Sequence, residues 1–531
     1  MIRRIFASTV LFMLISFSSG WATEDSTYYV TQNGSGAHNG WSYADAWSAS
    51  DFNKKENWSS AEDVKKIDPG DTVYICGNIN SMLVIKQSGT KSKKITIRGD
   101  FSGHAGTISS PKWSGLLIRG KSYISILNIT IYDCSTSGIE IDTYSQPTDV
   151  TGIIIEGVIS HSNHHNGILL NTYGDINKIY DVTIKNCLTY NNGEFGYRIS
   201  GYIEDVTLEE CVSHNDSQTG PMWGVMFQGR HTIANSGWSH YYGNIYVRDE
   251  PNNVDGAFAK QVSYMWLNKE AGGIGTLDAG EYYHDAGNDK IYVHLNGTDP
   301  NTNGITIVHR YSQNVIATDC TVYNTANPTG GEGHGMGFEF GAKNCGFYRC
   351  TSYNNGDSNG GSGFVAMINE NCTVAYCTAY GNHGSGFSGQ KNSGLKSYNN
   401  IAYNNKFGFF YFDYFDVTIK NCIAYSNNVA GISANGGNVK IDNDYNCSYG
   451  NGNNFNNISK GKYSLESDPL FADLYDNNFQ LQSNSPCKDA GLNIPGIHPT
   501  TDIRGENAPI GEFPDIGAWE IEVIQPPKNL Q

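Results

Sequence analysis

The stretches YCTAYGNHGSGFSGQ (376–390), NNIAYNNKFGFFYF (399–412) and NCIAYSNNVAGISAN (421–435) repeat one pattern every 22 or 23 residues. The second position of each stretch is Cys or Asn, a Tyr follows three residues later, and a Gly further on precedes a large apolar residue. From that Gly onward, apolar side chains recur with period two, as in a strand with one buried face. Short strands that recur at a fixed interval predict coils stacked along one axis.

The same pattern extends over most of the chain, with a period of roughly 22 to 30 residues. Turn residues interrupt it too often for helical repeats, which are the alternative. The predicted fold class is therefore all-β, a right-handed parallel β-helix in which each coil adds about 4.8 Å. Aligning the strand motifs on their Gly predicts one internal stack of Phe338, Phe364, Phe387 and Phe409. The other motifs are SGIEID (137–142), NGILLN (166–171), FGYRIS (195–200), WGVMFQ (223–228), MGFEFG (336–341) and SGFVAM (362–367).

Twelve cysteines in an exported chain would ordinarily suggest disulfides. Most of them occupy one phase of the repeat, which predicts a buried ladder of free thiols instead. Pairing within that stack remains the alternative in an oxidising compartment. Asn residues behind the Tyr or His position are predicted to bridge successive coils through their amides. These are Asn191, Asn215, Asn324, Asn354 and Asn404.

The N-terminus has the layout of a secretory signal peptide, residues 1–22. Arg3 and Arg4 precede an apolar run that ends at Phe17. A membrane anchor is the alternative, but about 13 apolar residues are short of the ~20 that a spanning helix needs. We therefore expect a secreted, periplasmic or cell-surface protein with no transmembrane segment after cleavage.

A gap of 113 residues between Gly224 and Gly337 marks an insertion, and the loss of the repeat near both ends marks caps. The predicted organisation is a signal peptide (1–22), an N-terminal cap and first coil (23–109), coils (110–228), a β-rich insertion (229–308), coils (309–458), a C-terminal capping segment (459–522) and a tail (523–531).

Charge and composition exclude several classes of protein. The formal net charge is −17, and it becomes −19 when the leader is removed, which argues against a nucleic-acid partner. Aromatic residues make up 12% and charged residues only 16%, which argues against disorder. We expect the protein to be a monomer. A groove along stacked strands suits an extended glycan better than a small ligand.

The two ends of the mature chain carry a family resemblance. The opening YYVTQNGSG (28–36) and the ending DPLF (468–471), NFQLQSNSPCKDAG (478–491) and PDIGAWE (514–520) resemble bacterial exported proteins of the pectate-lyase-like β-helix superfamily. The stretch GEYYHDAGNDKIYVHL (280–295) is similar to insertions in β-helix proteins that act on plant or algal glycans. The resemblance implies a polysaccharide or oligosaccharide partner. It leaves the reaction open, because the superfamily includes lyases, glycosidases, uronate epimerases and proteins without known catalysis.

Outward-facing polar residues are the candidate catalytic groups. A lyase needs a base and a cation that stabilises the enolate, whereas a glycosidase needs two carboxyl groups. Glu339 and Arg198 are predicted on outward strand positions, with His334 upstream of Glu339 and Asp357 one coil later. Each also has a plain interpretation as an ordinary exposed strand or turn residue.

The candidate substrate-binding residues are Phe410, Phe412, Trp223, Gln228, Gln390 and Lys391. Exposed rings could stack on sugar faces, although cover by another segment is the alternative for Phe410 and Phe412. Pectate lyases of the branch that the ending resembles use a Lys base and an Asp cluster for calcium. That Asp cluster is missing here, so no metal site or cofactor is identified. Calcium is the one cofactor that the resemblance leaves open. We predict an enzyme that cleaves or modifies a polysaccharide, and a non-catalytic glycan-binding or surface-structural protein is the alternative.

Overall fold

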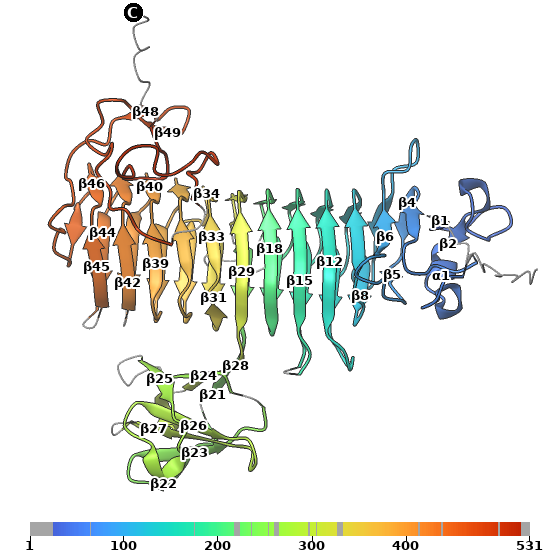
Figure 1. Ribbon diagram of the computed structural model, residues 1–531, viewed down its shortest axis with the longest axis horizontal. Coiled ribbons are helices and arrows are strands. Elements are labelled where there is room, and N and C mark those ends of the chain that lie inside the picture. The colour runs from blue at the N-terminus through green and yellow to red at the C-terminus, as the bar shows by residue number, and fades with distance from the viewer. Residues whose placement is uncertain are drawn as a thin grey trace, which may run out of the picture.

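The computed structural model describes residues 25–521 apart from 64, 175, 217–222, 235, 253, 260–264, 296–297, 304, 327–332, 413–414, 437–438 and 497–499. The predicted signal peptide and C-terminal tail lie outside the described residues. Within the described part, three long parallel sheets of 15, 12 and 12 strands wind around one axis as a right-handed β-helix, called the solenoid below (Figure 1). The predicted fold class is confirmed.

The first sheet runs the full length of the solenoid. In spatial order its strands are β2 (Trp47–Ser48), β1 (Thr27–Thr31), β3 (Thr72–Ile75), β6 (Ile95–Arg98), β9 (Ile124–Leu127), β12 (Val150–Glu156), β15 (Ile179–Lys185), β18 (Ile203–Glu209), β29 (Ser312–Thr318), β33 (Gly346–Tyr348), β36 (Thr373–Ala375), β39 (Leu395–Tyr398), β42 (Phe415–Lys420) and β45 (Val439–Asp444), with β32 (Ala342–Lys343) beside β29.

The second sheet is made of three-residue strands. They are β4 (Asn78–Asn80), β7 (Thr107–Ser109), β10 (Thr130–Tyr132), β13 (Ile159–His161), β16 (Leu188–Tyr190), β19 (Val212–His214), β30 (Thr321–Tyr323), β34 (Thr351–Tyr353), β37 (Thr378–Tyr380), β40 (Ile401–Tyr403), β43 (Ile423–Tyr425) and β46 (Cys447–Tyr449).

The third sheet contains the Gly-led motifs. Its strands are β5 (Leu83–Val84), β8 (Leu116–Arg119), β11 (Ile139–Asp142), β14 (Ile168–Asn171), β17 (Tyr197–Ser200), β20 (Trp223–Gln228), β31 (His334–Glu339), β35 (Phe364–Met367), β38 (Ser385–Gln390), β41 (Phe407–Phe412), β44 (Ala430–Asn435) and β47 (Phe455–Asn456).

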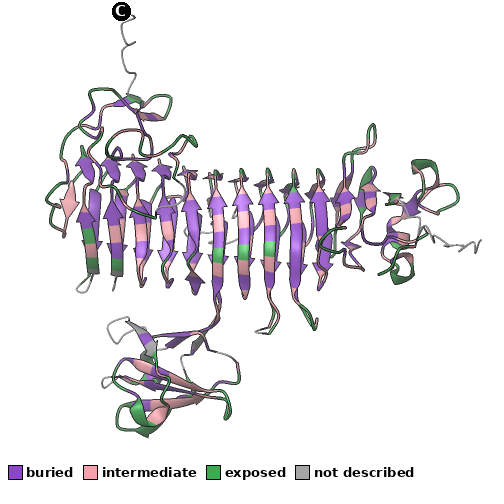
Figure 2. Cartoon of the chain, in the orientation of Figure 1, coloured by how far each residue is buried: buried purple, intermediate pink, exposed green. Residues whose placement is uncertain are grey.

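The inward side chains of all three sheets form one continuous apolar core. Figure 2 shows the solenoid strands buried over most of their length. All twelve cysteines are buried free thiols, which agrees with the predicted ladder and not with its disulfide alternative. Burial raises the pKa of thiols such as Cys134 and Cys422, each to about 12, so they pack as small apolar groups.

The high Asn content follows from the corners of the coils. The residue before each ladder Cys and the residue after each ladder Tyr or His adopt left-handed backbone, for example Asn186 (φ 51°) and Asn191 (φ 55°). Asn tolerates this conformation better than most residues that carry a Cβ, so the sequence selects it there.

The amide ladder lies one residue later than the sequence predicted. Asn191, Asn215, Asn324, Asn354 and Asn404 are the left-handed corner residues. The next residue in the turn is buried and makes the inter-coil bonds. Asn355 donates from its backbone and from Nδ2 to Asn382 Oδ1 (3.0 and 2.9 Å), and Asn382 bonds to Asn405 in the same way (3.0 and 2.9 Å).

The predicted aromatic stack is only partly correct. Phe364, Phe387 and Phe409 stack with ring centroids 5.0 and 4.8 Å apart. Phe338 belongs to another internal column and stacks on Phe347 (4.5 Å), because Met336 is the residue in register with Phe364. The repeat Gly of this coil is therefore Gly335 and not Gly337. A two-residue shift keeps the same side chains outward, so Glu339 still points out of the core.

The insertion is an eight-stranded sheet that leaves the solenoid after β20 and returns to it before β29 (Figure 1). Its strands, in spatial order, are β21 (Arg230–Ala234), β28 (Ile305–Arg310), β24 (Gly256–Ala259), β25 (Met265–Lys269), β26 (Glu281–Asp285), β27 (Lys290–His294), β23 (Ile245–Asp249) and β22 (Ser239–Tyr242). A short helix, α2 (Pro300–Asn303), precedes β28.

Additional structure packs at the N-terminal end of the solenoid and along the side of its last coils. At the N-terminal end, helix α1 (Ala49–Phe52) packs Phe52 against Trp58. The hairpin β48 (Phe471–Asp473) and β49 (Asn478–Leu481) places Phe479 against Tyr380 and Tyr403 of the outer Tyr ladder, so it covers the outer face of the second sheet beside the last coils (Figure 1). Capping of the C-terminal strand edges by residues 459–522 stays a prediction.

Replacing Asn382 by Ala tests the amide ladder. It leaves the buried amide donors of Asn355 without their acceptor, and we expect a loss of at least about 2 kcal/mol and a lower melting temperature in circular dichroism. The matched control is Asn354→Gly, because Gly keeps the left-handed corner and Asn354 is exposed. Equal losses in the two variants would contradict the assignment of the ladder.

Candidate functional site

Two parallel rows of side chains cover the outer face of the third sheet. The first row, in register from β8 to β44, is Leu117, Glu140, Leu169, Arg198, Met226, Gly337, Val365, Ser388, Phe410 and Ser433. The second row is Arg119, Asp142, Asn171, Ser200, Gln228, Glu339, Met367, Gln390, Phe412 and Asn435. Most of the predicted site residues therefore lie on one face.

Glu339 is the most perturbed carboxyl group on this face. Burial raises its pKa from 4.5 to about 7, and the nearby Arg198 guanidinium opposes that rise. Gln228 Nε2 donates to Glu339 Oε2 (3.0 Å), and Ser200 Oγ donates to Gln228 Oε1 (3.3 Å). A polar chain across three strands thus fixes the carboxyl group of Glu339, which can give or accept a proton near neutral pH.

Arg198 lies two strands from Glu339 and interacts with it electrostatically. Its Nη1 lies 4.0 Å from Glu194 Oε2, and its guanidinium lies over the Phe195 ring (4.9 Å). The buried Nε atom makes no hydrogen bond within the described residues. Burial lowers the pKa of Arg198, but 33% of its side chain is exposed. A part-exposed cation on this face is a feature that an anionic substrate group would satisfy.

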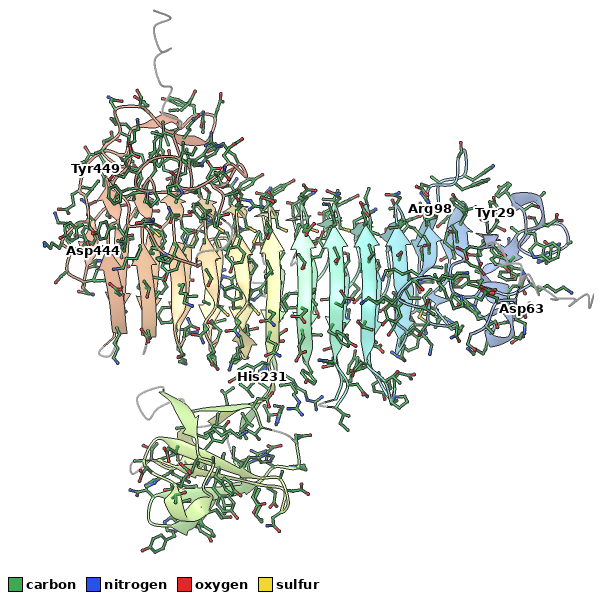
Figure 3. The ribbon with its side chains drawn as sticks, viewed as in Figure 1. Tyr29, Asp63, Arg98, His231, Asp444 and Tyr449 are labelled. Carbon is green, nitrogen blue, oxygen red and sulfur yellow. The ribbon has the colours of Figure 1, made fainter. Side chains whose placement is uncertain are left out.

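The insertion contributes to the rim of this site. His231, which is labelled in Figure 3 between the solenoid and the insertion, stacks on Phe340 with centroids 4.3 Å apart. Burial lowers the pKa of His231, and the charge of Arg198 lowers it further. On the other side of Arg198, His165 Nδ1 lies 3.0 Å from Glu194 Oε1.

Trp223 forms an apolar floor beside Glu339. It is buried and packs with Phe195, Met226 and Val365 on the outer face of the sheet. A Cβ on Gly337 would lie 1.6 Å from the Trp223 ring, so the ring crosses the sheet only because that position is Gly. Trp223 therefore acts as a packing residue between the polar site and the next pocket.

A pocket of about 230 Å³ follows on the C-terminal side. His334, Gln390, Phe410 and Phe412 line it. Phe410 stacks on Phe412 (5.3 Å), and both rings are half-exposed. Their contact with sugar rings stays a prediction. His334 Nδ1 accepts a hydrogen bond from the backbone N–H of Ser362 (3.1 Å), which fixes the imidazole at this pocket, at the opposite end of β31 from Glu339.

Asp357 and Lys391 lie in turns. Asp357 Oδ1 accepts from the backbone N–H of Asn359 (2.8 Å), so this carboxylate stabilises a turn whose next residues border the pocket. Lys391 has left-handed backbone (φ 58°) directly after β38 and is absent from the residues that line the pocket. Neither residue is brought to Glu339, and their predicted roles stay predictions. Among the described residues, no three His, Cys, Asp or Glu side chains lie close enough to hold a metal ion.

The sequence did not predict a further pocket on the same face of the third sheet. It has a volume of about 470 Å³, it lies over β8 and β11, and Trp113, Arg119, Glu140, Tyr144 and Tyr173 are among its lining residues. The motif SGLLIR (114–119) carries the same Ser-Gly signature one period before SGIEID, and extending the repeat by one coil would have placed Arg119 beside Asp142.

A comparison with protein-family profiles agrees with the fold. Residues 287–446 match the family profile described as right handed beta helix region. No curated protein sequence matches the chain. Similar solved structures include pectate lyase Pel9A (13% identity, covering 94% of this chain and 97% of that one, TM-score 0.45), the A-module of mannuronan C-5 epimerase AlgE4 from Azotobacter vinelandii (12%, 75% and 91%, 0.43) and XylC with xylose (9%, 93% and 98%, 0.45). Identities this low are insufficient to transfer an activity.

The chain is a right-handed β-helix protein. No helix in the described ranges is long and apolar enough to cross a membrane.

Replacing Glu339 by Gln should change stability in a pH-dependent way. Because the pKa of Glu339 is raised in the folded state, folding favours the protonated form. The contribution of protonated Glu339 to the free energy of unfolding is therefore lost as the pH rises from about 4.5 through 7. We therefore expect Glu339→Gln to have a melting temperature close to that of the wild type at pH 5 and a higher one at pH 8. The corresponding gain in the free energy of unfolding at pH 8 is at most about 3 kcal/mol, before solvent screening is taken into account. A melting difference that is constant between pH 5 and 8 would contradict the raised pKa.

Proposed function

We propose that this protein is an exported enzyme that cleaves or modifies an extended polysaccharide, with Glu339 as its general acid–base group. The observation that carries the proposal is the half-buried Glu339 carboxyl group, whose pKa of about 7 suits proton transfer at neutral pH. The two rows along the third sheet offer a polymer several polar and aromatic contacts, separated by buried apolar positions such as Met226 and Val365. Export is proposed from the predicted leader.

The arrangement favours β-elimination at a uronic acid unit. Arg198, whose side chain is 33% exposed, would bind the uronate carboxylate through its guanidinium group and would stabilise the enolate that forms. Glu339 in its ionised form would remove the C5 proton. The electron pair of the broken C–H bond then forms the C4–C5 double bond, the C4–O bond breaks, and the leaving oxygen takes a proton from water. Return of a proton to the opposite face instead of bond cleavage would give epimerisation.

Hydrolysis is the second candidate, because a second carboxyl group lies close by. Glu194 is 4.0 Å from Arg198 and 3.0 Å from His165, so both Glu194 and Glu339 flank the same guanidinium. In this reaction Glu339 would begin as the protonated acid and Glu194 would act as the nucleophile or the base.

The pH profile separates the two reactions. If Glu339 is a base, kcat/KM rises as pH passes through about 7, because only the ionised form removes a proton. If Glu339 is the acid, kcat/KM falls over the same range. Purified protein is incubated with a panel of acidic and neutral polysaccharides, and we follow the ultraviolet absorbance of unsaturated uronates together with new reducing ends. Lyase action raises both signals, and hydrolysis raises only the reducing ends.

Glu339→Gln should lower kcat by at least about a hundredfold, because general acid–base groups typically contribute that much. The matched control is Glu156→Gln, an exposed strand carboxylate of the first sheet, which should retain wild-type turnover. Unchanged turnover in Glu339→Gln would remove Glu339 from the mechanism. Binding to the panel without turnover would favour a non-catalytic glycan-binding protein.

A further inference from the structure

The pocket over β8 and β11 stands apart from the polar site at Glu339. Four strand steps separate β11 from β31 along the third sheet, which corresponds to about 19 Å. The pocket lies on the same outer face, and its volume of about 470 Å³ falls within the usual range of small-molecule sites.

Three exposed aromatic side chains are among the residues that line it. Trp113 is 61% exposed, Tyr144 is 51% exposed and Tyr173 is 47% exposed, although large aromatic side chains are buried to a high degree on average. Tyr144 and Tyr173 pack edge to face with centroids 5.3 Å apart. The floor is Leu117, an outward-facing side chain that is only 7% exposed. Flat exposed rings above an apolar floor suit a flat apolar ligand face, such as the C–H face of a pyranose.

The polar groups of the pocket are arranged for hydrogen bonding without a net positive charge. Arg119 binds the fully buried Asp142 through Nε (2.7 Å) and Nη2 (2.6 Å), so these two charges compensate one another. Ser114 Oγ donates to Glu140. Burial raises the pKa of Glu140, and the charge of Asp142 raises it further, which brings the carboxyl group closer to its neutral form. An anionic sugar would find no uncompensated cation here, whereas hydroxyl groups would find both donors and acceptors.

The same rings border a second hollow. A pocket of about 490 Å³ shares Tyr144 and Tyr173 and continues past Gln146 to Arg230 and Asn252 at the insertion. A ligand longer than one sugar ring can therefore pass over the two tyrosines toward the insertion.

We propose that the pocket formed by Trp113, Tyr144, Tyr173, Arg119 and Glu140 binds a neutral pyranose unit of a glycan chain. Binding of a sugar at this pocket does not depend on which reaction Glu339 performs. If the β-elimination proposed for Glu339 also holds, the natural substrate carries neutral sugars about 19 Å from the processed uronic acid unit, and is therefore a mixed glycan rather than a uniform polyuronate.

The test uses the full-length protein with Glu339→Gln, so that no ligand is consumed. Isothermal titration calorimetry measures binding of neutral hexasaccharides of xylose, glucose, mannose and galactose, and of hexamers of galacturonate and mannuronate. We expect at least one neutral hexamer to bind. Adding Trp113→Ala should weaken that affinity about tenfold, which corresponds to ~1.4 kcal/mol. Tyr173→Ala should weaken it in the same direction.

The matched control is Trp41→Ala, which removes a similarly exposed indole (54%) from the N-terminal cap. It should leave the affinity unchanged, and circular dichroism melting should show that all variants fold. Failure of every neutral hexamer to bind, or equal affinity with and without the Trp113 ring, would overturn the proposal. If Trp113→Ala weakens binding while Glu339→Gln alone still turns over substrate, the pocket stands and the proposed role of Glu339 fails.

Discussion

Stacking of each coil on the next in register is the constraint on which the whole molecule depends. Parallel pairing repeats at about 4.8 Å, so every side chain meets its equivalent in the neighbouring coils. Only side chains that stack on copies of themselves, or on close substitutes, satisfy this condition over many coils. The core therefore consists of columns, such as Phe364, Phe387 and Phe409, and of buried cysteines that remain free thiols.

The same constraint explains the buried polar ladders. A coil must turn three corners, and each turn would leave backbone donors inside the structure without partners. Asn solves two problems at once. An Asn at the corner tolerates left-handed backbone, and an Asn one position later accepts hydrogen bonds from the preceding coil, as Asn382 does from Asn355. Stability is consequently distributed along the axis, and an end requires a dedicated cover such as the N-terminal helix that packs Phe52 against Trp58.

On the outer face, stacking has the opposite consequence, because no core enforces sameness there. Neighbouring coils present Asp142, Asn171, Ser200, Gln228 and Glu339 in a single row. Departures from repetition on this face concentrate charge and apolar area locally. The polar site at Glu339, the Trp223 cluster and the two aromatic pockets are four such departures along one line, and a chain-like ligand could contact several of them together.

The sequence by itself determined the repeat, the strand motifs, the inward and outward faces and the free cysteines. These follow from period-two alternation and from a recurring interval, which are local properties. It also identified Glu339 and Arg198 as outward residues. The predicted register across the insertion was wrong by two residues, because motifs separated by 113 positions can be aligned in more than one way. Only the observed pairing of Met336 with Phe364 decides between these alignments. The tertiary structure alone decided that burial raises the pKa of Glu339 to about 7, that Trp223 crosses Gly337, and that Arg119 and Glu140 share a pocket with three exposed rings. Burial and proximity arise from residues far apart in the chain, and the periodicity of the sequence carries no information about them.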